Sequence, residues 1–324
     1  LDDERIGSGG ATLNALRRLA EETLGDAESL ESWWRGQRVL MIHSGGDSRR
    51  LPQYSLSGKL FSALPVKTPW GETSTVLDEM LALSSTWAAQ LESGLVVASG
   101  DVILTFDANR LHWDRPGVSG VAMREPLEVA GKHGVFVMDE DGRVYSFLQK
   151  PSAPQIRAAG GLLPEATAAL DTGLFRFDAP TAARLTALAG VAQHAGRWET
   201  DPGILARTAD SLPFFDLYEH FTMGLTGEWA PGPADPPASF RLADVLRGVP
   251  FHCDLVEGEF THIGTTQLFR RLMTESTAFS ALYQAQQRLG MVAPPGLRSS
   301  GVIVDSALTG GVLGAGAVAI ECDL

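Results

Sequence analysis

The sequence predicts an α/β fold, in which helices cover a mixed, mostly parallel sheet in three layers. Short apolar runs at 39–42 and 95–98 have the length and the β-branched content of strands. They alternate with stretches, such as 13–20 and 73–91, in which apolar residues recur at helical spacing. Such an alternation is typical of parallel strands that are joined by crossover helices.

Size, charge and cysteine content narrow the function. A chain of 324 residues can bury a large core. The formal net charge of −13 argues against nucleic acid and against an anionic membrane as partners. The two cysteines, Cys253 and Cys322, have no pairing pattern and no metal-type spacing. Since no apolar run is long enough for a membrane span and no signal peptide is visible, we expect a cytoplasmic protein.

The first element is a glycine-rich stretch at 6–12, which leads into a helix that contains Leu13, Leu16 and Leu19. A glycine loop before a helix can bind an anion, because the first N–H groups of the helix have no partner within it. The alternative is a flexible lead-in. The stretch lacks the lysine of a Walker A loop.

The strongest signal lies at 39–66. The strand at 39–42 leads to Gly45-Gly46, which are followed by Arg49, Arg50 and Lys59. Glycine amides and three cations suit a polyphosphate. In an acidic chain, this basic cluster predicts an anion site. The alternative is a tight turn with solvated basic residues.

This segment resembles the signature of the sugar-nucleotide pyrophosphorylases, a strand followed by Gly-Gly-x-Gly-Thr-Arg-Leu and a later Pro-Lys. The matching positions are Gly45, Gly46, Arg50, Leu51 and Lys59. Ser48 stands in place of the third glycine, Arg49 in place of the threonine, and Gly58 in place of the proline. These departures resemble the fucose-1-phosphate guanylyltransferase branch, which occurs alone or fused to a fucokinase.

The next elements are a helix over 73–91, with Thr73 and Ser74 as candidate caps, and a strand that ends in Gly100-Asp101. A carboxylate at the carboxyl end of a strand is well placed to hold Mg²⁺ while substrate phosphates supply further oxygens. Taken alone, Asp101 is better explained as the cap of a following turn. The resemblance implies that it is the magnesium ligand.

Residues 134–151 predict a β-hairpin with its turn at 139–142. The hairpin ends in Gln149-Lys150-Pro151, which resembles the Glu-Lys-Pro of related enzymes, and the resemblance assigns the sugar phosphate to Lys150. His133, just before the hairpin, either faces the site or belongs to a surface loop.

A helix-like stretch at 154–170 precedes Asp171-Thr172-Gly173. This tripeptide resembles the strand that lines the sugar pocket in the wider family, where short polar side chains beside glycine let sugar hydroxyls reach side chains and backbone. A plain buried strand end is the alternative. Further on, 215–220 begins a helix.

Residues 258–266 resemble the strand-to-helix turn Trp-x-Asp-x-Gly-Thr, which supplies a second magnesium aspartate in other pyrophosphorylases. Here His262 takes the place of the aspartate, and Gly264-Thr265 keeps the turn. A neutral imidazole is a poor ligand for Mg²⁺. Either His262 binds a phosphate or sugar oxygen, or a carboxylate elsewhere completes the metal shell.

From about residue 300 the composition and the spacing of apolar residues change. Val312, Val318 and Leu324 stand six apart among small residues, which is the spacing of a parallel β-helix. The resemblance implies a Rossmann-like nucleotidyltransferase domain over 1–275, a helical connector over 276–300, and the first coils of a left-handed β-helix over 301–324. We expect further chain after Leu324.

The activity implied by the resemblance is the synthesis of GDP-L-fucose and pyrophosphate from GTP and L-fucose 1-phosphate, with Mg²⁺ as cofactor. The implied catalytic residues are Arg50, Lys59 and Lys150, with Asp101 as the metal ligand. The implied nucleotide contacts are Gly7, Ser8, Gly9, Gly10, Thr12, His43, Gly45, Gly46, Ser48, Arg49 and Gly100. The implied sugar-phosphate contacts are His133, Asp171, Thr172, Gly173, His262 and Thr265.

Two alternatives stay open. In the first, the reaction is the same but the substrate is another sugar 1-phosphate or a nucleotide with another base, since residue types alone do not fix guanine. Otherwise the protein is a sugar-nucleotide sensor without catalytic activity.

Overall fold

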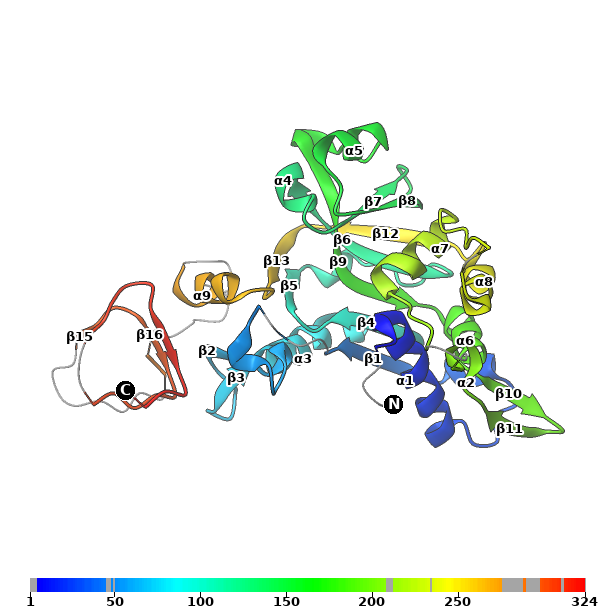
Figure 1. Ribbon diagram of the computed structural model, residues 1–324, viewed down its shortest axis with the longest axis horizontal. Coiled ribbons are helices and arrows are strands. Elements are labelled where there is room, and N and C mark those ends of the chain that lie inside the picture. Colours follow the sequence, from blue (N-terminus) through cyan, green and yellow to red (C-terminus); the bar gives the residue numbers. More distant parts are fainter. Residues whose placement is uncertain are drawn as a thin grey trace. The chain divides into compact units, whose positions relative to one another are not determined.

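The computed structural model describes residues 5–44, 48, 50–207, 212–233, 235–275, 288–289, 298–309 and 312–323. The chain forms two compact units, each assembled from three separate stretches (Figure 1). Unit 1 comprises Leu1–Ile42, Ala89–Ala98 and Ala108–Glu257. Unit 2 comprises His43–Ala88, Ser99–Asp107 and Gly258–Leu324.

Unit 1 is built on a seven-stranded sheet in the order β1-β4-β9-β6-β12, to which β7 and β8 add a hairpin beside β9. The strands are β1 (Arg38–His43), β4 (Gly94–Ser99), β6 (Val118–Pro126), β7 (Gly134–Met138), β8 (Val144–Gln149), β9 (Thr167–Phe177) and β12 (Phe251–Val256). A separate antiparallel ribbon joins β10 (Val191–His194) and β11 (Arg197–Thr200).

The sheet is mixed, as predicted, and the α/β prediction is confirmed. Strand β9 lies between β4 and β6 and pairs antiparallel with both, whereas β12 pairs parallel with β6. The expectation of a mostly parallel sheet is wrong. Its pairing is dominated by β9, which runs against its neighbours, and by the antiparallel β7-β8 hairpin.

The helices of unit 1 pack around a core of aromatic and aliphatic side chains. They are α1 (Gly7–Thr23), α2 (Leu30–Arg35), α4 (Leu127–Ala130), α5 (Ala153–Ala158), α6 (Ala179–Leu188), α7 (Thr222–Thr226) and α8 (Pro237–Leu246). Shorter turns are η3 (Ala108–Arg110), η4 (Pro164–Ala166), η5 (Gly203–Leu205) and the π-helix η6 (Leu217–Phe221). In the core, Phe136 packs edge-to-face on Phe175 and Phe251. The buried Trp34 indole N–H donates to Thr186 Oγ1 at 2.9 Å.

Unit 2 contains the basic loop that follows β1 and the strand-to-helix turn at Gly264-Thr265. Its helices are α3 (Val76–Ala88) and α9 (Thr266–Thr274), with 3₁₀ turns η1 (Pro52–Tyr54) and η2 (Lys59–Phe61). Strand β2 (Ala63–Lys67) pairs antiparallel with β3 (Thr73–Thr75), and β5 (Val102–Phe106) pairs antiparallel with β13 (Gly258–His262).

The last part of unit 2 consists of short parallel strands. Strand β16 (Val302–Val304) pairs with β14 (Arg288–Leu289) and with β18 (Val318–Ile320), while β15 (Arg298–Ser299) pairs with β17 (Val312–Leu313). Most of the predicted helical connector at 276–300 lies outside the described residues. Its described dipeptides, 288–289 and 298–299, are extended because each pairs with a later strand, so the helical expectation is wrong there.

The strand expected at 39–42 is β1, which is half-buried because it is the terminal strand of the sheet order. Two further expectations need correction. Thr73 and Ser74 belong to β3, and Thr75 takes over the capping role through its contacts with Asp78. Of the helix-like stretch at 154–170, α5 is α-helical and η4 is a single 3₁₀ turn, whereas residues from Thr167 onward pair in β9.

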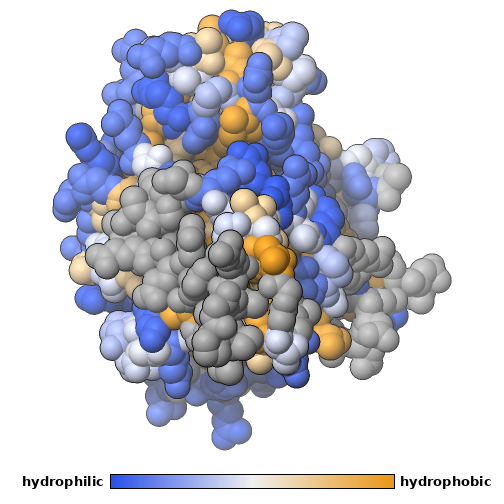
Figure 2. Space-filling view, turned by 90° about the vertical axis from the view of Figure 1, so that its left-hand side faces the viewer, coloured by the Kyte–Doolittle hydropathy of each residue, from blue (hydrophilic) through white to orange (hydrophobic). Residues whose placement is uncertain are grey.

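Within the described part of the chain, helices that combine the length and apolar character needed to cross a membrane are absent. On the face shown in Figure 2, hydrophilic residues predominate and hydrophobic residues form scattered groups between them. Such scattered apolar residues are normal for a protein surface.

Candidate active site

Asp101 and Lys59 form an ion pair at the carboxyl end of β4. The Lys59 ammonium lies 2.8 Å from Asp101 Oδ2, and Ser99 Oγ donates to Asp101 Oδ1 at 2.9 Å. Beside them, the Gly100 N–H donates to the carbonyl of His43, the last residue of β1, at 3.0 Å. The structure therefore brings together four residues that the sequence assigned to the site, and it adds Ser99, which the sequence analysis missed.

His262 completes this cluster. Because β13 pairs antiparallel with β5, His262 lies opposite Val102, directly after Asp101. Its Nε2 is 3.4 Å from Asp101 Oδ2, and the N–H of the next residue, Ile263, donates to the Asp101 carbonyl at 2.7 Å. His262 is thus a neighbour of Asp101, the residue that the resemblance makes the magnesium ligand.

The cluster keeps Asp101 charged. Burial by itself would raise the pKa of the Asp101 carboxyl, but hydrogen bonds from His262 and Lys59, together with their charges, hold that pKa well below its ordinary value. The side chains are mostly shielded, with Lys59 14% and Asp101 26% exposed. An ionised carboxylate therefore persists at neutral pH and below.

The loop before the cluster contains two positions at which the sequence departs from the pyrophosphorylase signature. Ser48 has a φ of 47°, a left-handed conformation that a glycine would adopt without strain. Gly58, at φ 85°, directly precedes Lys59 and η2. A proline could not take this φ, because its ring fixes φ near −65°. Gly45, Gly46 and Arg49 lie outside the described residues.

Arg50 is held through its backbone. Its carbonyl accepts from the Thr266 N–H at 2.8 Å and from Thr266 Oγ1 at 3.1 Å, so the loop is tied to the first residue of α9. Thr265 caps this helix, with its Oγ1 accepting from the Leu268 N–H at 3.1 Å. The Arg50 residue itself is exposed. The predicted strand-to-helix turn is confirmed.

In unit 1, the predicted sugar-binding tripeptide is a bulge in a buried strand. The register between β6 and β9 passes from Val121↔Leu174 to Ala122↔Asp171, which leaves Thr172 and Gly173 unpaired. Thr172 Oγ1 donates to the Val121 carbonyl at 2.6 Å, and the Gly173 N–H donates to Asp171 Oδ1 at 2.8 Å. Bulges interrupt a strand at defined places and often lie next to active sites.

Asp171 is a buried carboxyl with an unusual titration. Burial raises its pKa to about 7, against the lowering effect of the Gly173 N–H. Near neutral pH it is therefore present in both protonation states. A carboxyl in this condition can both donate to and accept from a hydroxyl.

Lys150 and His133 lie together at the base of the confirmed β7-β8 hairpin. The Lys150 N–H donates to the His133 carbonyl at 2.9 Å, and the Lys150 φ of 48° is left-handed. Strained backbone of this kind persists where the surrounding structure enforces it, and it clusters at ligand sites. The next residue after His133 is Gly134, where a β-carbon would come within 3.1 Å of Asp171 Cβ. The predicted sugar-phosphate residues of unit 1 are thus neighbours.

The glycine stretch at 6–12 is not a loop, and this expectation is wrong. Helix α1 already begins at Gly7, and the N–H groups of Gly9 and Gly10 donate to the Phe215 carbonyl at 2.8 and 3.2 Å. Ser8 Oγ accepts from the Leu217 N–H, and a β-carbon on Gly7 would overlap the Phe215 carbonyl. The glycines therefore permit close packing against 215–217. Their assignment to the nucleotide stays a prediction.

The donor set around Asp101 suits a cation held by one protein carboxylate. The described residues contain no group of three metal-type ligands. A single ionised carboxylate nevertheless fits Mg²⁺, which is often bound by one or two carboxylates together with substrate phosphates. His262 is engaged with Asp101 and does not add a hard ligand.

Taken together, the chain is a mixed α/β protein with a shielded, charged lysine–aspartate–histidine cluster at a strand end. Residues 31–324 match the family model described as the fucose pyrophosphorylase domain. The chain belongs to this family, and the resemblance found in the sequence is confirmed.

Three curated relatives are similar over about half of the chain. A bifunctional fucokinase/GDP-fucose pyrophosphorylase of Arabidopsis thaliana is 34% identical over 200 residues, which are 53% of this chain and 19% of the relative. A fucose-1-phosphate guanylyltransferase of Mus musculus is 35% identical over 161 residues, 46% of this chain and 26% of the relative. An L-fucokinase/L-fucose-1-P guanylyltransferase of Bacteroides fragilis is 27% identical over 163 residues, which are 48% of this chain and 17% of the relative. The matched part is thus about a quarter or less of each relative.

Among solved structures, one described as mannose-1-phosphate geranyltransferase from Thermus thermophilus aligns with 89% of this chain and 93% of its own. The sequence identity is 14% and the TM-score is 0.41. This likeness is too weak to support an argument.

Proposed function

We propose that the chain joins GTP and L-fucose 1-phosphate to give GDP-L-fucose and pyrophosphate. The observation that carries the proposal is the Lys59–Asp101–His262 cluster, with its 2.8 Å ion pair at the end of β4. Membership of the fucose pyrophosphorylase family and the names of the relatives support the choice of substrates.

The reaction is an in-line displacement at phosphorus. A phosphate oxygen of the sugar phosphate forms a bond to the α-phosphorus, the bond from that phosphorus to the bridging oxygen breaks, and pyrophosphate leaves with the electron pair. No covalent enzyme intermediate is needed, so the chain contributes positioning and charge.

Lys59 supplies charge next to the α-phosphate. The ammonium has three N–H donors, of which one is engaged by Asp101 and the others serve phosphate oxygens. The ion pair fixes the ammonium in advance, so little reorganisation is required when substrate binds. Arg49 and Arg50 hold the triphosphate and the leaving pyrophosphate.

Asp101 would hold Mg²⁺, and this ion, when bound, neutralises phosphate charge. The lowered pKa of Asp101 leaves the carboxylate ionised for that task. His262 orients Asp101 together with the lysine, through the same carboxylate oxygen, Oδ2, and in the complex it reaches a phosphate or sugar oxygen.

Lys150 holds the attacking sugar phosphate, and the bulge at 171–173 binds the sugar. The carboxyl of Asp171 exchanges hydrogen bonds with a sugar hydroxyl, to which its pKa of about 7 is suited. His133, Thr172 and Gly173 complete the sugar side. The Gly264-Thr265 turn supports His262.

The organisation proposed along the chain is a Rossmann-like nucleotidyltransferase domain over 1–275, a connector over 276–300, and the first coils of a left-handed β-helix. The parallel pairing of β14, β16 and β18, and of β15 with β17, supports a coiled arrangement of short strands.

The test is pyrophosphate release with Mg²⁺, GTP and L-fucose 1-phosphate, with each component omitted in turn. We expect release only when all three are present. ATP, UTP and CTP in place of GTP, and other sugar 1-phosphates, report the specificity. Binding of GTP and sugar phosphate without any release would refute the transferase and favour a sensor.

A further inference from the structure

A pocket of about 580 Å³ lies in unit 2, lined by the end of β2, by the turn that joins β2 to β3, and by the first turns of α3. Its lining comes entirely from residues 66–82, and the structure describes this stretch without a gap. None of these residues is assigned to the transfer reaction. The volume is within the range of sites that bind small molecules.

Trp70 forms an aromatic wall of the pocket. The residue is 68% exposed, although tryptophan is highly buried on average. Its place in the β2-β3 turn is fixed, because the Gly71 N–H donates to the Thr68 carbonyl at 2.9 Å and the indole N–H donates to Glu72 Oε2 at 3.3 Å. The polar edge of the indole is thus satisfied, and the faces of its ring remain for a ligand.

Glu79 brings a buried carboxylate to the same pocket. The residue is 6% exposed, and its Oε1 accepts from Ser74 Oγ. Among the described residues, its second oxygen, Oε2, has no hydrogen-bond partner. The neighbouring Asp78 also lines the pocket, with its Oδ2 accepting from the N–H and the hydroxyl of Thr75. The pocket therefore offers a carboxylate oxygen that the described protein does not use.

This carboxylate has no counter-charge. Within the described part of the chain, neither Glu79 nor Asp78 forms an ion pair, and Lys67, the cation in the lining, is an exposed residue that pairs with neither. Burial raises the pKa of Glu79, the hydrogen bond from Ser74 lowers it, and the charge of Asp78 raises it further. A buried charge without a partner is costly, so a cation in the pocket would offset this cost.

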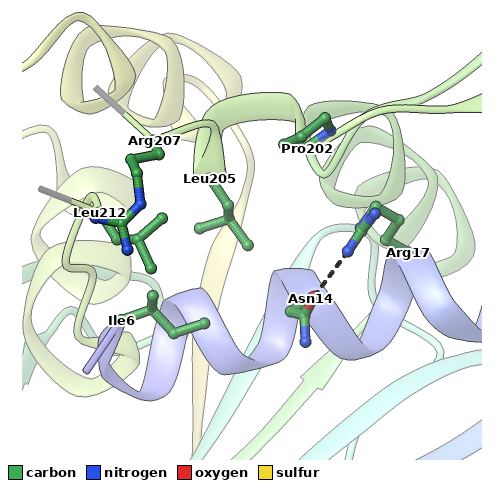
Figure 3. Close-up of a pocket in the computed structure, with 7 residues that line it drawn as sticks. All are labelled: Ile6, Asn14, Arg17, Pro202, Leu205, Arg207 and Leu212. Carbon is green, nitrogen blue, oxygen red and sulfur yellow. Dashed lines mark hydrogen bonds between the residues drawn. The ribbon is translucent and has the colours of Figure 1, made fainter. Parts of the chain in front are cut away.

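A smaller pocket of about 290 Å³ beside α1 in unit 1 shows the opposite situation (Figure 3). There the charged group is Arg17, which donates to Asn14 Oδ1 at 3.1 Å and pairs with Glu21 Oε1 at 3.3 Å. The charge of Arg17 is therefore balanced on its own helix, whereas that of Glu79 is not.

We propose that the pocket between the β2-β3 turn and α3 binds a small aliphatic amine in its ammonium form. The ammonium lies between the indole face of Trp70 and the carboxylate of Glu79, both of which attract a cation. The alkyl chain lies on Leu81 and Ala82, which line the pocket from α3. This site involves binding only and does not depend on the proposed transfer reaction.

The test is isothermal titration calorimetry at low ionic strength, without nucleotide or sugar phosphate. The probe is putrescine, and its uncharged match is 1,4-butanediol, in which hydroxyls replace the two ammonium groups. The variants are Glu79→Gln, which keeps an acceptor for Ser74 but removes the charge, and Trp70→Leu, at an exposed position. The control is Glu128→Gln, which removes the same charge from an exposed residue in the first turn of α4. Thermal melts confirm that each variant is folded.

We expect Glu79→Gln to weaken putrescine binding about tenfold or more, as for the loss of a charged hydrogen-bond partner. Trp70→Leu should weaken it about twofold to fivefold, the size of a cation–π contact at an exposed site. Glu128→Gln should bind as the unmodified chain does, and butanediol should bind more weakly than putrescine. Equal affinity in Glu79→Gln and Glu128→Gln would indicate general attraction to an acidic protein and overturn the proposal, as would equal affinity for amine and diol.

A second measurement does not depend on Glu79→Gln being stable. The indole N–H signal of Trp70, assigned by its loss in Trp70→Leu, should shift in nitrogen-edited NMR spectra of the unmodified chain when putrescine is added. An unchanged Trp70 signal at the highest putrescine concentration would mean that the pocket stays empty and would overturn the proposal.

Discussion

The imidazole of His262 lies directly over the backbone of Gly264, where a β-carbon would approach the ring to 2.4 Å. The glycine thus lets the histidine fold back toward Asp101, 3.4 Å away. The Gly264-Thr265 turn therefore has two functions, since it starts α9 and also makes room for the ring beside the carboxylate.

Gly264→Ala should displace His262 and lower kcat for pyrophosphate release on the order of tenfold to a hundredfold, because small misplacements of catalytic groups are costly. Steady-state kinetics measure the loss. The control is Gly314→Ala, where an added β-carbon meets nothing within 4 Å. A kcat equal to that of the control would contradict the positioning role.

Lys59→Met should lower kcat on the order of 10²–10³-fold, since it removes charge at the reacting phosphate while keeping a similar length. The same assay reports this loss. Lys67→Met, at the exposed end of β2, should stay close to the unmodified rate. If the two variants turned over equally fast, Lys59 would have no catalytic part.

Asp171→Asn should change the pH dependence of stability. The folded-state pKa is raised from 3.8 to about 7, so between these values the folded chain binds the proton and the unfolded chain does not. The stability contributed by protonated Asp171 is complete below pH 4 and is lost as pH rises through 7. At about 1.4 kcal/mol for each pKa unit, the loss is about 4 kcal/mol, which the asparagine variant should escape.

Urea unfolding from pH 4 to pH 8 measures this difference. Asp244→Asn, an exposed aspartate on α8, should give a curve parallel to that of the unmodified chain. Should Asp171→Asn also run parallel, its carboxyl would titrate normally in the folded protein.

Thr172→Val should destabilise the bulge in β9. It removes the donor to the Val121 carbonyl at 2.6 Å in a fully buried place, at a cost of about 1–3 kcal/mol. Chemical unfolding reports the cost, with Thr274→Val, at a partly exposed helix position, as the control. Equal midpoints for both variants would mean that the hydroxyl does not secure the bulge.

Local patterns predicted much of this molecule. The β7-β8 hairpin and the strand before Asp101 follow from short-range signals, namely apolar runs bounded by turn residues. The turn at Thr265 was predicted through the family resemblance. The cluster of Lys59, Asp101 and His262 joins residues far apart in sequence, and its grouping was anticipated only through the family resemblance.

The errors share a cause in tertiary contacts. Gly9 and Gly10 suggested a loop, but the Phe215 carbonyl stabilises a helix there. Thr73 and Ser74 could have capped a helix, but pairing with the partner strand β2 makes this segment extended. Strand β9 lies between β4 and β6 and runs antiparallel to both, and no local sequence pattern encodes this direction.

The place of β9 also sets an order of assembly. Strand β6 lies between β9 and β12 in the sheet, and both of these strands come later in the chain than β6. During synthesis, β6 therefore emerges with two unsatisfied edges and gains its first partner only when residues 167–177 have left the ribosome. Because unpaired strand edges promote association between chains, substitutions that delay β9 should lower the yield of soluble protein before they affect the finished fold.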